Sequence, residues 1–261
     1  MQDLNSLQSS DSSDEGAQAW AIPFADMMTL LLTLFILLLV ILKESEKFVD
    51  RQINLLLEET YEQLDDKIKN EDVSIERVTK GIQITLRGNL FQSMKANVNK
   101  NYIPVIQEIS KIIEDCRLFN IGETEQYSAL MKFLDDRNEE LNVEIRCEGH
   151  TDDAILPPQS DFSNNWELSS ARSLKVVNIM NDASSISEKY FSYNGYGEFR
   201  PLINVSGIDD FQKKKQARAY NRRVEIYLDA FARPKTRSSE AEFVKMLDNK
   251  FKKEEKLQLK N

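Results

Sequence analysis

The sequence predicts an α+β fold in which a single membrane-spanning helix precedes a sandwich of helices on a mixed sheet. Residues 21–42 form a nearly uninterrupted apolar run, and about 20 apolar residues suffice to cross the hydrocarbon core of a bilayer. The rest of the chain is charged and alternates strand-like with helix-like segments, which is typical of an α+β domain. The 261 residues leave room for one or two folded domains, and the net charge of -9 argues against nucleic acid as the main partner.

The first 19 residues precede the apolar run and are polar. They are rich in Ser and Asp and contain no Lys or Arg. We therefore expect a disordered tail rather than a cleaved signal peptide, which would carry basic residues at its start. The span itself is expected over residues 20–42, as a permanent anchor.

The predicted span carries a carboxylate. Asp26 follows Pro23, which fits the first turn of a helix, and Trp20 can anchor at the interface. Thr29 and Thr33 follow Asp26 at i+3 and i+7, so the three side chains share one helix face. An acid in hydrocarbon is costly, which favours a site that faces a partner helix or a wet cavity and carries an ion. The alternative is an interfacial Asp that reaches up to water.

The charges that flank the span give little information on its orientation. Lys43, Lys47 and Arg51 follow the span, and the positive-inside rule would place that side of the membrane in the cytoplasm. These bases alternate with acidic residues, which makes the rule a weak guide here.

Residues 43–71 predict an amphipathic helix. A short coiled coil is the alternative, and it would be consistent with a dimer. Apolar side chains and one Thr recur there at helical spacing, namely at Val49, Ile53, Leu56, Leu57, Thr60, Leu64 and Ile68.

Periodicity places the elements of a domain in residues 72–231. Helices are predicted from Pro104 onward and over residues 166–180, and an insertion at residues 117–141 is helical from Ser128. Residues 232–261 form a charged tail that is expected to be helical. Strands are predicted at residues 73–78, 82–86, 143–148, 190–195 and 223–228.

Residue types that often carry chemistry are few. Cys116 and Cys147 have no C-x-x-C spacing, so they are either one disulfide or two buried free thiols. The single His, His150, is expected as a hydrogen-bonding loop residue. Catalytic triads, H-E-x-x-H zinc sites and G-x-x-x-x-G-K-[ST] loops do not occur in the sequence. We therefore expect neither a metal site nor a cofactor, and no ordinary hydrolase or nucleotide enzyme.

Four motifs follow one another in the second half of the chain. In this order they strongly resemble the OmpA-like peptidoglycan-binding domain, and the resemblance covers about residues 80–230. The motifs are Gly149-His-Thr-Asp-Asp153, Ser163-Asn-Asn-Trp-Glu-Leu-Ser-Ser-Ala-Arg172, Gly195-Tyr-Gly-Glu198 with Pro201, and Asn221-Arg-Arg-Val-Glu-Ile226.

This resemblance implies a binding site for the diaminopimelate of a peptidoglycan peptide stem. Asp152 would take the ammonium group and Arg172 the carboxylate, the latter through a two-pronged hydrogen-bonded pair. Thr151, Asn165 and Arg222 fall on supporting positions. The structural alternatives are that Asp152 caps a turn and that Arg172 pairs within the protein.

The start of the chain resembles the B subunit of ion-driven rotary stators of the MotB/PomB type. Those proteins carry Trp-x-x-Pro-Phe/Tyr-Ala-Asp-Met-x-Thr-Leu-Leu, which residues 20–31 match. By this resemblance Asp26 is the ion-carrying carboxylate, with Thr29 and Thr33 beside it. Two B chains would sit as a homodimer inside a ring of five MotA-type A subunits. Ion binding at Asp26 would then step the ring around the B dimer.

The resemblance also implies a location. The N-terminus would lie in the cytoplasm, the span in the bacterial inner membrane and residues 72–231 in the periplasm, against the positive-inside rule. Residues 43–71 lie where stator B subunits carry a plug that blocks ion leak, and a spacer or dimer coil is the alternative. Protons are favoured over sodium as the coupling ion.

Three functions remain open on the sequence. A flagellar stator B subunit is favoured. The acidic tail and the irregular residues 154–162 depart from the flagellar pattern, and the same architecture resembles the B subunit of Zorya anti-phage defence motors. A passive membrane tether to peptidoglycan is the third, and Asp26 argues against it because a tether gains nothing from a carboxylate in its span.

Overall fold

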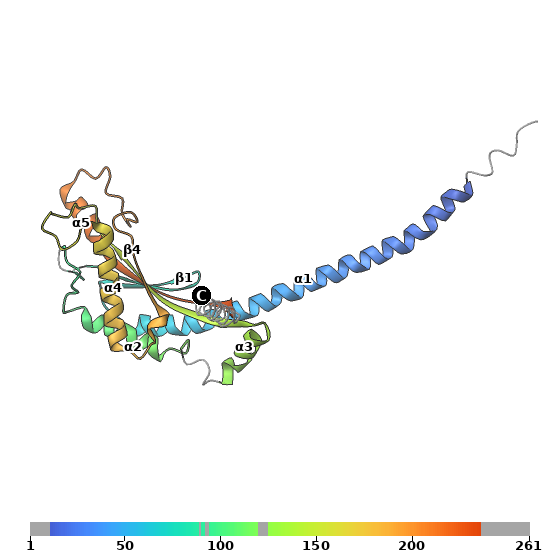
Figure 1. Cartoon of the computed structure of the whole chain (residues 1–261), viewed down its shortest axis with the longest axis horizontal. Coiled ribbons are helices and arrows are strands. Elements are labelled where there is room, and N and C mark those ends of the chain that lie inside the picture. The colour runs from blue at the N-terminus through green and yellow to red at the C-terminus, as the bar shows by residue number, and fades with distance from the viewer. Residues whose placement is uncertain (1–10, 89, 92–93, 120–124, 236–261) are drawn as a thin grey trace, which may run out of the picture. The chain divides into compact units, whose positions relative to one another are not determined.

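A computed structural model of the chain describes residues 11–88, 90–91, 94–119 and 125–235 (Figure 1). The chain divides into two compact units, residues 1–50 and 51–261. The predicted fold class is confirmed, since an apolar N-terminal helix precedes a mixed α and β domain built on a five-stranded sheet. Most of the predicted C-terminal tail, residues 236–261, lies outside the described residues.

Helix α1, Asp11–Lys67, contains the predicted span. The helix is long and apolar enough to cross a membrane, and the side chains of residues 20–42 are all exposed. The prediction of a disordered tail up to residue 19 is wrong for residues 11–19, because the helix begins at Asp11. Pro23 consequently lies inside the helix and not in its first turn.

The last part of α1, residues 51–67, belongs to the second unit and packs on it. Arg77 bonds Glu58 at 3.3 Å and Asn54 at 3.0 Å, and Arg117 bonds Glu59 at 3.1 Å. Because the apolar face is buried within the chain, it is not free to form the coiled coil that the pattern also allowed. The buried side chains are Ile53, Leu56, Leu57, Thr60 and Leu64.

The sheet of the second unit has the strand order β1-β2-β5-β3-β4. Neighbouring strands are antiparallel, except that β3 and β4 are parallel. The core lies on the central strands, where Ile145 and Leu228 are paired and both fully buried. The strands are β1 Val73–Val78, β2 Gly81–Leu86, β3 Glu139–His150, β4 Phe191–Gly195 and β5 Arg223–Pro234.

The helices of this unit differ from prediction at two places. The helix expected up to residue 141 ends at Asp136, because Asn138 adopts the left-handed conformation with φ of 56° and strand β3 begins directly after it. Helix α5 was not predicted at all. The helices are α2 Ile103–Asp115, α3 Glu125–Asp136, α4 Asn165–Ala183 and α5 Phe211–Asn221, with a short 3-10 helix η2 at Glu188–Tyr190.

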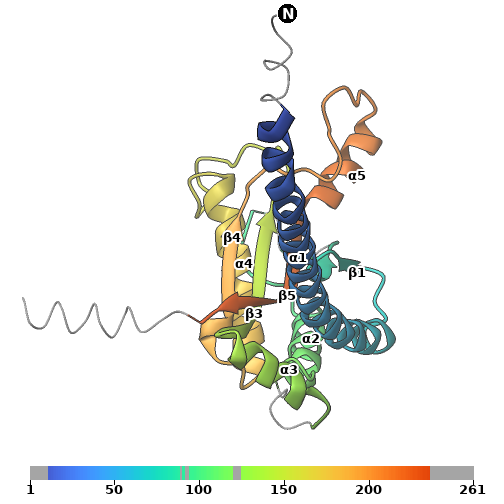
Figure 2. The same cartoon turned by 90° about the vertical axis from the view of Figure 1, so that its right-hand side faces the viewer.

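Helix α4 packs across β3 and β4 and against α2 (Figure 2). Two glycines allow its close approach to the strands. A Cβ at Gly149 would lie 2.1 Å from the carbonyl oxygen of Ser169, and one at Gly195 would lie 2.3 Å from the backbone nitrogen of Ser170. Both strands therefore come very near the helix at the ends that lead into the motif loops.

The two cysteines are buried free thiols in the structure. Burial raises the pKa of the Cys147 thiol to about 12, and it also raises the pKa of Cys116. Of the two alternatives that the sequence left open, the structure has the free thiols and not the disulfide.

Candidate ligand-binding site

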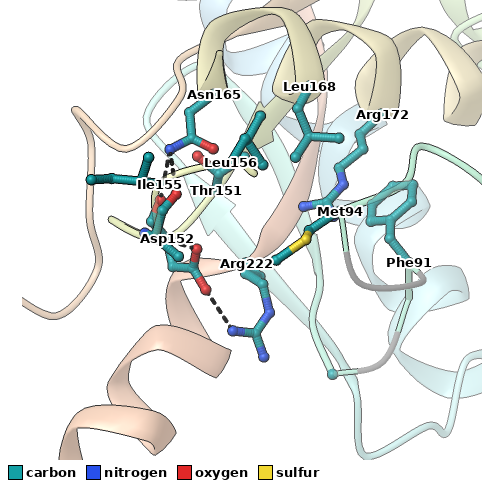
Figure 3. A pocket seen from close by; sticks show the side chains of 12 residues that line it. Phe91, Met94, Thr151, Asp152, Ile155, Leu156, Asn165, Leu168, Arg172 and Arg222 are labelled. Carbon is teal, nitrogen blue, oxygen red and sulfur yellow. Dashed lines mark hydrogen bonds and ion pairs between the residues drawn. The ribbon is translucent and has the colours of Figure 1, made fainter. Parts of the chain in front are cut away.

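A cavity of about 210 Å³ opens where the loop after β3 meets helix α4 (Figure 3). Four parts of the chain line it: the segment after β2, the loop after β3, the first half of α4 and the residue before β5. All five predicted binding residues are among its lining residues. These are Gly88, Phe91, Met94, Thr151, Asp152, Ala154, Ile155, Leu156, Asn165, Leu168, Arg172 and Arg222.

Asp152 lies in the loop after β3, with its side chain largely buried. Its Oδ1 accepts a hydrogen bond from the backbone N–H of Ala154 at 3.3 Å, and its Oδ2 accepts from Nη1 of Arg222 at 2.7 Å. The turn-capping alternative is therefore present in the structure. It is compatible with a binding role, because a carboxylate has four lone-pair sites and two hydrogen bonds leave others free.

Arg172 projects from helix α4 into the same cavity and is almost wholly buried (Figure 3). Its Nε donates to the carbonyl oxygen of Lys95 at 3.1 Å, and its guanidinium lies 4.9 Å from the ring centre of Phe91. Burial lowers the pKa of Arg172 to about 10, with the charge of Asp152 opposing this shift and that of Arg222 adding to it. Arg172 stays cationic at neutral pH, and its charge acts on both of the other charged groups of the cavity.

Hydrogen bonds from Asn165 and Thr151 connect the segments around the cavity. Asn165 begins α4 and its Nδ2 donates to the carbonyl oxygen of Ala154 at 3.1 Å and to Oε2 of Glu198 at 2.8 Å. The backbone N–H of Thr151 donates to the carbonyl oxygen of Gly197 at 2.9 Å. The buried Thr151 hydroxyl has no hydrogen-bond partner among the described residues, so it can serve a bound ligand.

Sequence reasoning missed the ion pair next to this site and part of its lining. Arg218 of helix α5 donates two hydrogen bonds to Asp153, which follows Asp152 but does not line the cavity; they are 2.6 and 3.0 Å long and lower the pKa of Asp153. The apolar lining from Phe91, Met94 and Leu156 was also missed. The adjacent Asp152 and Asp153 hint at a cationic partner, but no local pattern shows which distant segments meet them.

A second charged cluster lies at the end of β3 and the start of β5. Oxygen and nitrogen atoms of the buried Glu148, His150 and Glu225 lie within 4.8 Å of one another and could hold a metal ion. However, Glu148 is paired with Arg146, and Nε of Arg223 donates to Oε1 of Glu225 at 2.5 Å. A divalent cation would have to compete with two guanidinium groups, so a charge-balanced structural network explains the cluster better.

His150 is the last residue of β3 and is buried, so its prediction as a loop residue is wrong. Its ring stacks on Tyr196 with 5.5 Å between ring centres, and its Nε2 lies 3.6 Å from Oε2 of Glu225. Burial lowers the pKa of His150. Burial alone would raise the pKa of Glu225, but the nearby His150 ring and the hydrogen bond from Arg223 outweigh it and hold that pKa at about 2. A neutral imidazole thus faces an ionised carboxylate at neutral pH.

The predicted span carries a polar stripe, formed by Asp26, Thr29 and Thr33, and it lies in the first unit. Thr29 Oγ1 donates to the carbonyl oxygen of Asp26 at 2.8 Å, and Thr33 Oγ1 donates to that of Leu30 at 2.8 Å. The two hydroxyls are thus bonded to their own helix backbone, and the helix places all three side chains on one face, as the spacing predicts.

Two family models match the chain. The model described as "Membrane MotB of proton-channel complex MotA/MotB" matches residues 7–53, and the model of the OmpA family matches residues 118–215. The first match contains the polar stripe, and the second contains most of the cavity residues.

Three known proteins illustrate the similarity. Motility protein B of Bacillus subtilis is 27% identical over 164 residues, which are 62% of this chain and 51% of that protein, so the match spans about half of its length. The uncharacterized protein YtxE of the same organism is 22% identical over 234 residues, covering 84% of this chain and 91% of that protein. A crystal structure of a putative MotB-like protein from Desulfovibrio vulgaris has the same fold, with a TM-score of 0.51, 18% identity, and coverage of 71% of this chain and 99% of that one.

Proposed function

We propose that this chain, in which a segment similar to membrane MotB precedes a segment similar to the OmpA family, is the MotB-type B subunit of an ion-driven rotary stator. The observation that carries the proposal is that one chain joins a membrane helix bearing Asp26 to a domain whose cavity holds Asp152 and Arg172. The first module would couple ion flow to rotation, and the second would keep the unit from rotating.

The anchoring half of the proposal rests on the charges of the cavity. A peptide stem of peptidoglycan that contains diaminopimelate offers an ammonium group and a carboxylate on one carbon. Asp152 would bind the ammonium group, and the buried guanidinium of Arg172 would bind the carboxylate. Thr151 would add its unbonded hydroxyl, and Asn165 would hold the loop in place.

Sedimentation with purified peptidoglycan tests this half. The change Asp152→Asn keeps the shape of the side chain and removes its charge, so we expect wall binding to fall about tenfold or more. Arg233→Gln is the matched control, because Arg233 pairs with Glu140 in an exposed ion pair at the far ends of β5 and β3. Equal binding of the Asp152→Asn protein and the wild type would remove Asp152 from the site.

The motor half rests on Asp26. Its position on an exposed, apolar helix requires partner helices that supply polar contacts, which MotA-type A subunits around a homodimer of this chain would provide. We propose two B chains within five A chains, with protons as the coupling ion. The unit would span the inner membrane once, with the domain in the periplasm, and would power flagellar rotation.

Ion flux in cells that co-express an A-type partner tests the motor half. We expect Asp26→Asn to assemble with the partner and to abolish flux. Leak should be unmasked by deleting residues 43–48 only, because residues from Ile53 onward pack on the domain and their loss would damage its core. Normal flux through the Asp26→Asn protein would refute the ion-carrying role. If assembled wild-type complexes carry no flux either, the chain is a passive tether.

A further inference from the structure

Helix α5 is basic in an otherwise acidic chain. Residues 211–222, which form α5 and the residue after it, contain five basic side chains and no acidic one, whereas the whole chain has a net charge of -9. Both arginines of this segment are held in ion pairs by the loop after β3. These pairs are Arg218 with Asp153 and Arg222 with Asp152.

The other three bases, Lys213, Lys214 and Lys215, form a lysine cluster at consecutive positions. Lys213 and Lys215 are exposed, and Lys214 is partly exposed and acts on Asp153 only at longer range. In the part of the chain that the structure describes, no acidic side chain forms an ion pair with any of the three. Positive side chains near the start of a helix also oppose its dipole, so the cluster does not stabilise α5. Its charge is left available for an anionic partner outside the domain.

The structure presents the lysine cluster on a firmly held helix. The side chain of Asp210 caps α5 by accepting the backbone N–H of Lys213 at 2.9 Å. At the other end, the Asn221 side chain accepts from the backbone N–H of Ile203 at 2.9 Å and donates to its carbonyl oxygen at 2.8 Å. Both views place α5 at the periphery of the second unit (Figures 1 and 2). A large partner can therefore reach the cluster.

The arrangement of the cluster favours a flexible partner. Successive residues of an α-helix point about 100° apart, so three consecutive lysines spread over about 200° around the helix. A flat membrane surface reaches one side of such a helix, whereas a flexible polymer can follow it around.

We propose that the lysine cluster of α5 binds an anionic phosphodiester polymer of the cell wall. Lysine binds phosphate as a point charge without fixed geometry, which suits repeating phosphates on a flexible chain. Carboxylates are matched better by the planar fork of arginine, and the two arginines of this segment pair with carboxylates in the structure.

This inference goes beyond the proposed stem binding and rests on it only for the location of the domain at the wall. Asp153, the partner of Arg218, follows Asp152 of the cavity, so a polymer on α5 would lie beside a bound stem. Two linked contacts hold a wall more firmly than either contact alone. Because the polymer and the stem use different side chains, the two contacts can be tested separately.

The experiment measures the binding of the full chain, in nanodiscs of neutral lipid, to soluble poly(glycerol phosphate) over a range of salt concentrations. The test variant replaces the three lysines of the cluster by Gln, and a second variant replaces them by Arg and keeps the charge. A control variant loses the same charge at three exposed lysines elsewhere in the domain. The control changes are Lys100→Gln, Lys111→Gln and Lys132→Gln.

We expect the wild type, the Arg variant and the control variant to bind the polymer, and the test variant to bind about tenfold more weakly or worse at low salt. The slope of log affinity against log salt concentration should be smaller by about 2 in the test variant, as for three lost phosphate contacts on a single-stranded nucleic acid. Equal affinities of the test and control variants, with both folded by circular dichroism, would overturn the proposal.

Two comparison ligands test the class of partner. Poly(glutamate) offers repeated carboxylates, and vesicles of phosphatidylglycerol offer phosphates on a membrane. We expect the wild type to bind both more weakly than poly(glycerol phosphate), and a preference for either one would overturn the proposal. Sedimentation with peptidoglycan that has been stripped of phosphate polymers reports on stem binding alone. The test variant should retain this binding, whereas its loss in the wild type would refute the proposed anchoring function instead.

Discussion

Glu225 is expected to stabilise the domain in a pH-dependent way. Its carboxylate accepts hydrogen bonds from Arg223 Nε at 2.5 Å and from the Tyr227 hydroxyl at 2.8 Å, and His150 lies 3.6 Å away. Folding lowers the pKa of Glu225 from its ordinary value of 4.5 to about 2. A shift of that size corresponds to about 3 kcal/mol of unfolding free energy at neutral pH.

The direction of the pH dependence follows from this shift. Because the folded pKa is the lower one, the contribution is complete above pH 4.5 and is lost as the pH falls from 4.5 towards 2. His150 acts in the same direction below its ordinary pKa of 6.5, since its lowered pKa means that the unfolded chain takes up the proton first. The domain should therefore lose stability throughout mild acid.

The change Glu225→Gln removes the charge and leaves the buried Arg223 without its anion. We expect the variant to be about 3 kcal/mol less stable than the wild type at pH 7 and to approach it near pH 2. Urea unfolding, followed by Trp166 fluorescence in a Trp20→Phe background and repeated from pH 7 to pH 2, measures this difference.

Glu140→Gln serves as the control for this experiment. It breaks the exposed Arg233–Glu140 pair on the same two strands, and we expect a loss of about 1 kcal/mol or less. A constant difference between Glu225→Gln and the wild type at every pH would refute the assigned pKa. No difference at pH 7 would refute the network itself.

Three further changes test the packing. Leu56→Ala should cost about 2–5 kcal/mol in urea unfolding because Leu56 is fully buried, whereas Leu55→Ala, at a half-exposed neighbour, should cost little; equal costs would show that this part of α1 does not pack on the domain. Gly149→Ala should lower the melting temperature strongly and reduce wall binding, because its Cβ would strike the backbone of α4, and an unchanged melting temperature would contradict that close approach. Ser110→Ala should cost about 1 kcal/mol in urea unfolding through loss of the 2.7 Å hydrogen bond that joins α2 to α4, and a neutral change would mean that this bond does not form.

Local patterns were sufficient for many elements of the fold. Strand β1 begins and ends as alternation predicts, and β2 differs by a single residue. The two modules could also be recognised, because their motifs lie in contiguous stretches of sequence. Errors occurred where a local signal competed with a longer-range one. The helix expected up to residue 141 gave way to β3, since pairing with β5 stabilises an extended strand from Glu139 onward.

In the cavity, too, local sequence patterns did not predict contacts between residues that are distant in the sequence. The motifs identified Asp152 and Arg172, because each lies in a recognisable local pattern. They gave no indication that Arg222 would form an ion pair with Asp152, or that Arg218, in a helix that was not predicted, would form one with Asp153. These pairs join residues about 65 to 70 positions apart, and no periodicity reports contacts over such separations.

The sequence by itself determined the membrane helix with Asp26 and its two threonines, because a helix converts spacing directly into a shared face. It also identified five polar and charged residues of the cavity, but not its apolar lining. Only the tertiary structure decided which charged side chains form ion pairs with one another, since these pairs join groups that folding brings together. It likewise decided that the apolar face of residues 51–67 is buried on the domain. An amphipathic pattern states that a face must be covered, and the packing of the whole chain decides what covers it.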